Sequence, residues 1–257
     1  MNGISRFFKQ VLRGAALAVW LGGVPALAQD TSCLHDPGRV HELRVLDEMQ
    51  LIDMMDQHPV LAAPPRLHRM LRSLVAASPR LRDGPAIHLL AFEDDREHNA
   101  YAANHGLVII TSALWRGATP LNDDELAAVI AHELAHIESH DALVEACGLV
   151  QRLGQPRLSI EVAREQMGVH MFNPRSPLAR EARELQHAQE HAADLRGIEL
   201  LRQVGRDPAA MASALAKIHG TEADGLNLLM GSSHPEVRER LARARAAANV
   251  PGPAPHD

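Results

Sequence analysis

Apolar residues recur at helical spacing through most of the chain, and only one short region has the apolar runs of a sheet. Helical spacing and helix-forming composition predict helices over residues 40–57, 65–77, 121–150, 178–203 and 208–219, with a last helix from 234 to about 247. Short apolar runs between turn residues predict strands over residues 87–92, 99–103 and 106–111. The pattern therefore predicts a mainly helical α+β domain with one small sheet.

The helix over residues 121–150 has the clearest start signal in the chain. Asn122 is a good capping residue, and Glu125 follows three residues later, as in a capping box. Asp123 and Asp124 suit the positive end of the helix dipole. The apolar positions that follow at helical spacing are Leu126, Val129, Ile130, Leu134 and Ile137. We therefore expect this helix to be anchored in the core.

Three segments lack such a pattern. Residues 155–177 are rich in Gly, Pro, Arg and Met, and they are interpreted as a connecting loop, with a mobile lid as the alternative. Residues 220–233 are loop-like, and residues 248–257 are expected to be a disordered tail. No linker divides the rest, so residues 29–247 are predicted to form a single domain.

The first 28 residues have the pattern of a secretory signal peptide. Arg6, Lys9 and Arg13 precede a short apolar run, and the A-x-A site ends at Ala28. No later apolar run is long enough to span a bilayer, so no transmembrane anchor is expected, while peripheral association with a membrane stays open. The signal peptide predicts that the domain lies outside the cytoplasm.

Composition narrows the remaining choices. Apolar residues make up 46% of the chain but aromatic residues only 3%, so the core must be built from aliphatic side chains and alanine. No basic run occurs beyond the N-terminus, which argues against nucleic acid as a partner. Cys33 and Cys147 could form a disulfide in an oxidising compartment, or Cys147 could be a free buried thiol, and the sequence leaves both open.

The predicted helix over residues 121–150 contains the motif H-E-x-x-H. His132 and His136 are one helical turn apart, so both imidazoles project from one face and can hold one Zn²⁺ ion. Glu133 between them can reach a metal-bound water. The motif also occurs by chance on ordinary solvent-facing helices, so its meaning depends on a third ligand.

Glu190 is the best candidate for that third ligand. The metzincin completion is absent, because the matching positions hold Ser139 and Ala142. Glu190 lies on a second predicted helix, with Asp194 one turn later on the same face. Two histidines and a glutamate form a catalytic zinc site with one open position. A solvated helix face is the simpler alternative for Glu190, but the neighbouring alanines favour close helix packing.

Two further features could serve the same site. If the strand over residues 106–111 lies at a sheet edge, it could pair with an extended substrate, and its candidate residues are Gly106, Leu107, Val108, Ile109 and Ile110. His234 and Arg240 could stabilise an oxyanion if the fold brings them to the metal. An ordinary core strand, a loop histidine and a surface arginine are the competing interpretations.

Together these residues resemble the HtpX/CAAX-prenyl-protease family of zinc metallopeptidases. The resemblance covers residues 86–241 and rests on the H-E-x-x-H, Glu190-x-x-x-Asp194, and His234-Pro235 with Arg240 six residues after the histidine. It implies a gluzincin-type α+β domain with a small sheet beside the H-E-x-x-H helix. It also implies a periplasmic metalloendopeptidase that acts on misfolded envelope proteins.

The expected chemistry is hydrolysis of an internal peptide bond with one zinc ion per chain. Glu133 would act as the general base, Asp194 would support the ligands, and His234 or Arg240 would stabilise the oxyanion. His234 could instead cap the zinc until substrate displaces it. The alternative function is a metal-dependent, chaperone-like binding factor for envelope proteins with little proteolysis.

Overall fold

The computed structural model describes residues 35–103, 105–154, 157–171, 173, 175–219 and 237–250. They all belong to one compact unit, Thr31–Asp257. The predicted signal peptide, Cys33, His234 and residues 251–257 lie outside the described residues.

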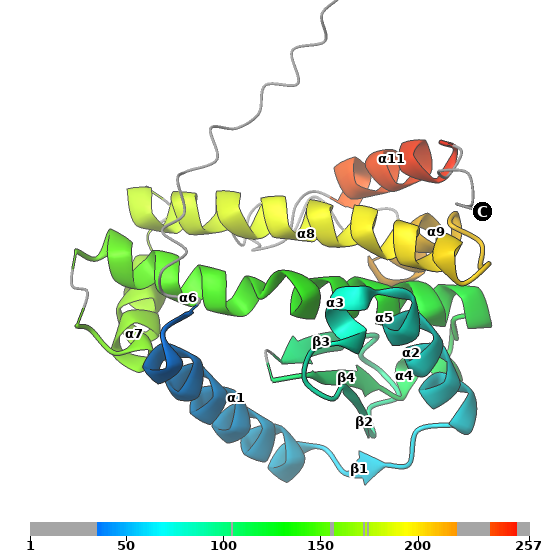
Figure 1. Cartoon of the computed structure of the whole chain (residues 1–257), viewed down its shortest axis with the longest axis horizontal. Helices are drawn as coiled ribbons and strands as arrows, with labels where there is room; N and C mark the ends of the chain where they lie inside the picture. The colour runs from blue at the N-terminus through cyan, green and yellow to red at the C-terminus, as the bar shows by residue number, and fades with distance from the viewer. Residues whose placement is uncertain are drawn as a thin grey trace, which may run out of the picture. The chain divides into compact units, whose positions relative to one another are not determined.

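Helices predominate, as the sequence predicts (Figure 1). In chain order the elements are α1 (Pro37–Gln57), β1 (Val60–Leu61), α2 (Pro65–Ala77), α3 (Pro79–Arg82), β2 (His88–Phe92), β3 (Ala100–Ala103), β4 (Leu107–Thr111), α4 (Ala113–Arg116), α5 (Asp123–Ser139), α6 (Asp141–Arg152), α7 (Ile160–Met171), α8 (Pro177–Gln203), α9 (Ala210–His219) and α11 (Val237–Ala248). The prediction of a mainly helical α+β fold with a small sheet is confirmed.

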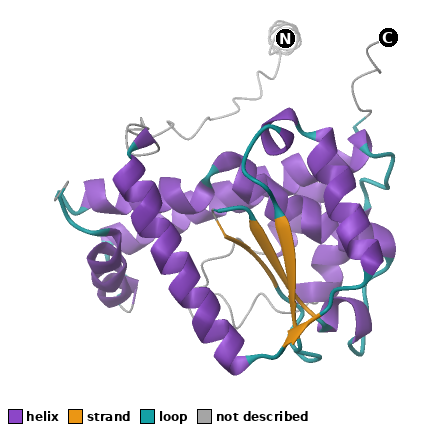
Figure 2. Ribbon diagram, turned by 60° about the horizontal axis from the view of Figure 1, so that its bottom comes forward, coloured by secondary structure: helices purple, strands orange, loops and turns teal. Residues whose placement is uncertain are grey.

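The sheet has four strands in the order β1-β2-β4-β3. Strand β4 pairs in parallel with β2 and antiparallel with β3, so its backbone is paired along both sides. Val108 and Ile110 join the main core, while Ile109 faces the opposite way, towards α1. Figure 2 shows the strands between α1 and the other helices. Within the described residues, β3 is the edge strand beside α5.

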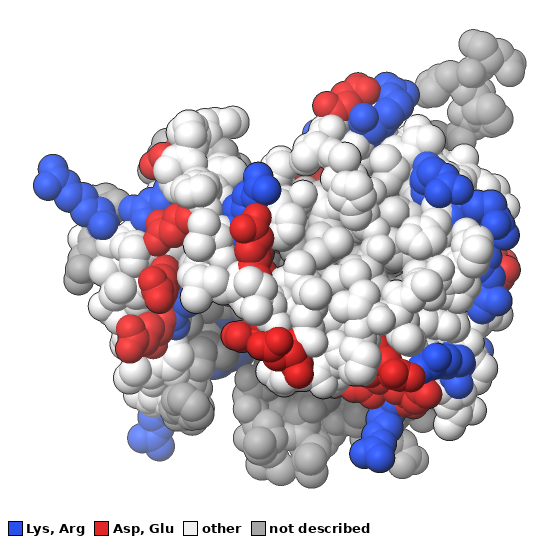
Figure 3. Space-filling view, turned by 90° about the horizontal axis from the view of Figure 1, so that it is seen from below, with Lys and Arg blue, Asp and Glu red and all other residues white. Residues whose placement is uncertain are grey.

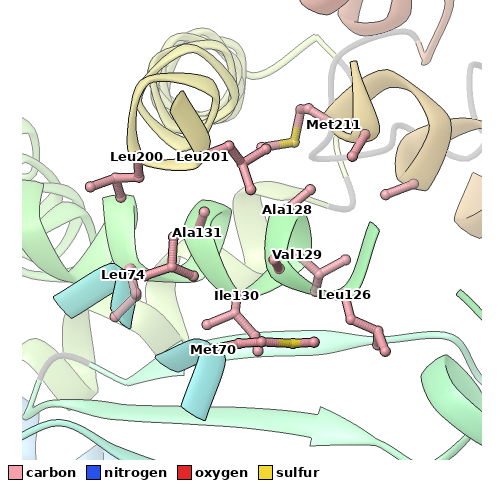
Figure 4. Packing of buried hydrophobic residues seen from close by; sticks show 14 of the residues in the cluster. Met70, Leu74, Leu126, Ala128, Val129, Ile130, Ala131, Leu200, Leu201 and Met211 are labelled. Atoms are coloured by element: carbon pink, nitrogen blue, oxygen red, sulfur yellow. The ribbon is translucent and has the colours of Figure 1, made fainter. Parts of the chain in front are cut away.

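Helix α5 lies at the centre of the core. Ala128 and Ala131 are buried where it meets α8 and α9, near Leu200, Leu201 and Met211 (Figure 4). On another face Ile130 packs towards Met70 and Leu74 of α2 (Figure 4). Small side chains let the neighbouring helices approach closely, and the larger ones exclude water. The helix that carries H-E-x-x-H is therefore held on several sides.

The predicted capping box of α5 is confirmed. Asn122 Oδ1 accepts hydrogen bonds from the backbone N–H groups of Asp124 and Glu125, and Glu125 Oε2 accepts one from the N–H of Asn122 at 2.7 Å. Glu125 is buried and also accepts a hydrogen bond from Lys217 of α9. The cap thus ties the start of α5 to a neighbouring helix.

Two predictions about helices are wrong. The single helix over residues 121–150 is interrupted at His140, whose φ of 55° places it in the left-handed region, and α6 begins at Asp141. The segment over residues 155–177, interpreted as a loop, contains α7. Ile160 and Ala163 of α7 are fully buried in a second apolar cluster with α6 and Leu43 of α1. Burial of these two residues favours helix despite the nearby prolines and glycines.

Cys147 is buried in this second cluster and is disulfide-bonded. The only other cysteine in the sequence is Cys33, which lies outside the described residues.

None of the described helices is both long and apolar enough to cross a membrane. Figure 3, viewed from the side on which α1 and β1 lie in Figure 1, shows small groups of acidic and basic residues around a broad area without either.

Gly197 of α8 lies directly against the backbone of α5. A Cβ atom there would lie 2.5 Å from Met211 Cε and 3.3 Å from the backbone nitrogen of His132. The larger side chain in Gly197→Val is expected to destabilise the protein by about 1–3 kcal/mol, because the packed helices must separate. Gly168→Val on α7 is the control, since a Cβ there meets nothing within 4 Å. Equal urea midpoints for the two variants would contradict this packing.

Candidate active site

Three potential metal ligands converge from two packed helices. His132 and His136 project from one face of α5, and Glu190 projects from α8. The two Nε2 atoms of the histidines are 3.1 Å apart. The carboxylate oxygens of Glu190 lie 3.5 Å from Nε2 of His132 and 3.6 Å from Nε2 of His136. Zinc bonds of about 2.0–2.2 Å in a tetrahedron would place donor atoms roughly 3.3–3.6 Å apart, so the set fits.

Each histidine directs its other ring nitrogen at a carboxylate. His132 Nδ1 lies 3.0 Å from Asp194 Oδ1, although its N–H is not well aligned for a strict hydrogen bond. His136 Nδ1 lies 2.7 Å from Asp141 Oδ2. A proton on each Nδ1 leaves both Nε2 atoms with lone pairs facing one another and Glu190. A shared cation relieves that repulsion, which is a second indication of a metal site.

The charge around His132 also favours a cation. Burial alone would lower the pKa of His132, but the carboxylates of Asp194 and Glu190 outweigh it and raise that pKa to about 10. The two carboxylates therefore stabilise positive charge beside them strongly enough to overcome desolvation.

Arg240 of α11 joins the two carboxylates of α8. Its Nε and Nη2 donate to Asp194 at 2.8 and 2.7 Å, and Nη1 lies 2.7 Å from Glu190 Oε2. The side chain is only 4% exposed, and all three of its nitrogens face carboxylates. Burial alone would raise the pKa of Asp194, but the hydrogen bonds from Arg240 and the nearby His132 imidazole lower it. Through these contacts Arg240 holds the carboxylates of Glu190 and Asp194 in position.

Glu133 faces the cleft beside these ligands. It is 8% exposed and lines a cavity of about 540 Å³ together with His132, His136 and Glu190. Burial raises the pKa of Glu133 above its ordinary value, and the nearby histidines partly offset this. A carboxylate with a raised pKa is a stronger base, which suits the role of general base.

The structure brings together most of the residues singled out in the sequence. His132, Glu133, His136, Glu190 and Arg240 all line the same cleft. Asp194 lies behind the ligands and contacts both His132 and Arg240, which agrees with the supporting role expected for it. His234 lies outside the described residues, so its proposed roles remain predictions.

The prediction that residues 106–110 lie at a sheet edge and pair with a substrate is wrong. The stretch Gly106 to Ile110 overlaps β4, whose backbone is already paired with β2 and β3 and has no free edge for a substrate. The cleft is lined instead by residues 97–103, which include the edge strand β3.

The sequence analysis also missed Asp141. On a continuous helix, a residue five positions after His136 would not face it. The left-handed conformation of His140 turns the chain and brings the Asp141 carboxylate to His136. The only sequence signal was an acidic residue shortly after the motif.

Asp141→Asn is expected to weaken metal binding about 10- to 100-fold, because it replaces the charged group that orients His136. Competition with a chromophoric zinc chelator measures the affinity. Asp53→Asn, at an exposed position on α1, is the control and should leave the affinity unchanged. Equal metal affinities for both variants would show that Asp141 does not support metal binding.

Fold and site together first define a class of protein. A mainly helical domain with a small sheet presents H-E-x-x-H from α5 and a glutamate from α8 to a common point, as zincins do. Residues 62–248 match the model for Peptidase family M48, and the chain belongs to that family.

Individual relatives agree with this assignment. Proteins named Protease HtpX homolog from Burkholderia mallei (strain SAVP1) and Burkholderia pseudomallei (strain 668) are each 28% identical over 202 residues. The match covers 70% of this chain and 65% of theirs, so the chain spans just under two thirds of their length. The crystal structure of S. mikatae Ste24p aligns with a TM-score of 0.51 at 15% identity. That alignment covers 80% of this chain and 55% of Ste24p, and it supports the fold.

Proposed function

We propose that this protein is a zinc-dependent metalloendopeptidase with one Zn²⁺ ion per chain. The observation that carries the proposal is the convergence of His132, His136 and Glu190 beside Glu133 in an open cleft. Two imidazoles and one carboxylate leave a coordination position for the reaction, as catalytic zinc sites do.

The residues around the ligands have separate tasks in this proposal. Zinc, when bound, supplies a Lewis acid that acidifies a water molecule and polarises the substrate carbonyl. Glu133 accepts a proton from the attacking water and donates it to the leaving amine. Asp141 and Asp194 hold the two imidazoles in orientation, and Arg240 holds Glu190 and Asp194.

Strand β3 is the element that best fits an extended substrate. It pairs with β4 along one side, and its residues line the cleft opposite α5. A peptide that adds to this edge by backbone hydrogen bonds would pass directly over the metal ligands. Strand addition reads the backbone rather than one side chain, so it suits an endopeptidase that acts on unfolded segments.

The N-terminal sequence and the family support a proposal for the cellular role. Residues 1–28 have the features of a signal peptide, which supports a periplasmic location. A cleft lined by β3, the edge strand of the sheet within the described residues, suits unfolded proteins better than one folded partner. We therefore propose that misfolded envelope proteins are the substrates.

Cleavage of casein, an unstructured protein, tests the activity. Zinc-loaded protein is expected to cleave casein internally, to lose activity in 1,10-phenanthroline, and to regain it when zinc is restored. Release of single amino acids from chain ends would instead identify an exopeptidase. Activity that survives complete metal removal would refute the zinc mechanism.

A further inference from the structure

The two ends of the cleft differ in chemistry. Near α9 the wall is apolar and includes Met211, Leu215 and Ile218. Near α6 and the N-terminal part of α8 it is polar and includes Glu145 and Gln186. Figure 1 shows α6 and α9 lying beside opposite parts of α8. The metal ligands line the cleft between these two ends.

The polar end contains hydrogen-bond acceptors without a matching donor. Gln186 Nε2 donates to Glu145 Oε1 at 2.7 Å, which is the only hydrogen bond found for the Glu145 side chain among the described residues. Gln186 Oε1 is shielded from solvent and accepts no hydrogen bond from any described group. Glu145 forms no ion pair within the described part of the chain, and Arg164 acts on it only through its charge. Partly buried carboxylates are normally paired, so Glu145 and Gln186 lack a cationic donor in direct contact.

The electrostatics of Glu145 support this conclusion. Burial raises the pKa of Glu145, and the hydrogen bond from Gln186 and the positive charge of Arg164 only partly offset it. The mechanism proposed for peptide cleavage uses neither Glu145 nor Gln186. A partly buried acid outside the catalytic chemistry but inside the substrate cleft is a candidate for ligand recognition.

The position of Gln186 relates this pair to the cleaved bond. Gln186 precedes the ligand Glu190 by four residues on α8, which places it about 6 Å along the helix axis. An extended peptide rises about 3.3 Å per residue. A side chain bound at Gln186 therefore belongs to a residue about two positions from the scissile bond.

We propose that Glu145 and Gln186 form a subsite for a Lys or Arg side chain of the substrate, and that the α9 wall accepts an apolar side chain on the opposite side of the cleaved bond. A substrate ammonium or guanidinium group would supply donors to Glu145 and to Gln186 Oε1. This inference rests on the proposed peptidase function and adds a substrate class to it.

Binding to a catalytically inactive variant tests the subsite separately from cleavage. Zinc-loaded Glu133→Gln protein is titrated with fluorescent peptides that carry one lysine, scanned over three positions on each side of an apolar residue. Norleucine peptides are the reference, because norleucine keeps the aliphatic stem without the charge. One lysine position, about two residues from the site of cleavage, is expected to bind about tenfold or more tightly than its norleucine counterpart.

Variants of Glu145 and Gln186 test whether these two residues cause the lysine preference. Adding Glu145→Gln should abolish the lysine preference, and Gln186→Met should reduce it. Glu184→Gln, at an exposed position on α8, should leave it intact. Zinc content and melting temperature must match across the set. Equal affinity of lysine and norleucine peptides at every position would overturn the inference.

Two further comparisons test whether the protein recognises a chain end and whether it cleaves the peptides that it binds. Each peptide is made with a free and an acetylated N-terminus, and a preference that needs the free amine would show recognition of a chain end, against the inference. The same peptides are offered to protein with Glu133 intact. Lysine-dependent binding without any cleavage would refute the peptidase function while leaving the subsite standing.

Discussion

Glu133→Gln is expected to lower kcat for casein cleavage about 100- to 10,000-fold, because an amide cannot accept the proton of the attacking water. The ligands His132, His136 and Glu190 are unchanged in this variant, so bound zinc should stay at one ion per chain. The rate is measured by release of fluorescent fragments, and the metal by elemental analysis of the same preparation.

The result separates the two functions that the sequence allows. A chaperone-like binding factor has no need of a general base, so Glu133→Gln would leave its effect on client proteins intact. Cleavage by Glu133→Gln at the full wild-type rate would refute the role of Glu133. Wild-type protein that holds zinc and protects clients but never cleaves them would favour the binding factor.

Arg240→Met is expected to destabilise the fold by about 3–5 kcal/mol, because it leaves the buried carboxylates of Asp194 and Glu190 without their shared cation. The loss should be larger in metal-free protein, since zinc supplies positive charge next to Glu190. Urea unfolding with and without zinc measures both values.

Arg243→Met is the matched control on the same helix. Arg243 is 56% exposed and, within the described residues, forms an ion pair only with Glu239, so its loss should cost about 0–1 kcal/mol. Equal destabilisation by the two variants would show that the buried contacts of Arg240 stabilise the fold no more than the exposed ion pair of Arg243 does. It would then also weaken the argument that Arg240 positions Glu190.

Features set by local chemistry were predictable from the sequence. Helix α2 occupies the predicted residues, and the capping box at Asn122 and Glu125 starts α5 as expected. Both depend on residues within one or two helical turns. The ligand set followed from two such helices, because His132 and His136 share a face and Glu190 lies in a helix whose alanines allow close approach.

Features set by contacts distant in sequence were not predictable. Strand β4 carries apolar residues on both faces, which fits an interior strand as well as an edge, and only the pairing with β2 and β3 decides between them. No glycine stands at or next to His140 to indicate that the helix ends there. Its left-handed backbone becomes understandable once Asp141 is seen beside His136.

The prediction of a loop where α7 lies was wrong for a similar reason. Its sequence contains a glycine and lies between prolines, which favours a loop on local grounds. Ile160 and Ala163 are nevertheless buried against residues far away in the chain, including Leu43 of α1. Such burial outweighs a weak local preference and cannot be inferred from one segment alone.

The most direct test of the account is anomalous diffraction at the zinc edge from crystals of the metal-loaded protein. The account predicts one zinc peak per chain, bonded at about 2.0–2.2 Å to Nε2 of His132, Nε2 of His136 and a carboxylate oxygen of Glu190. A zinc peak at other residues, or no peak in protein that cleaves casein, would contradict it.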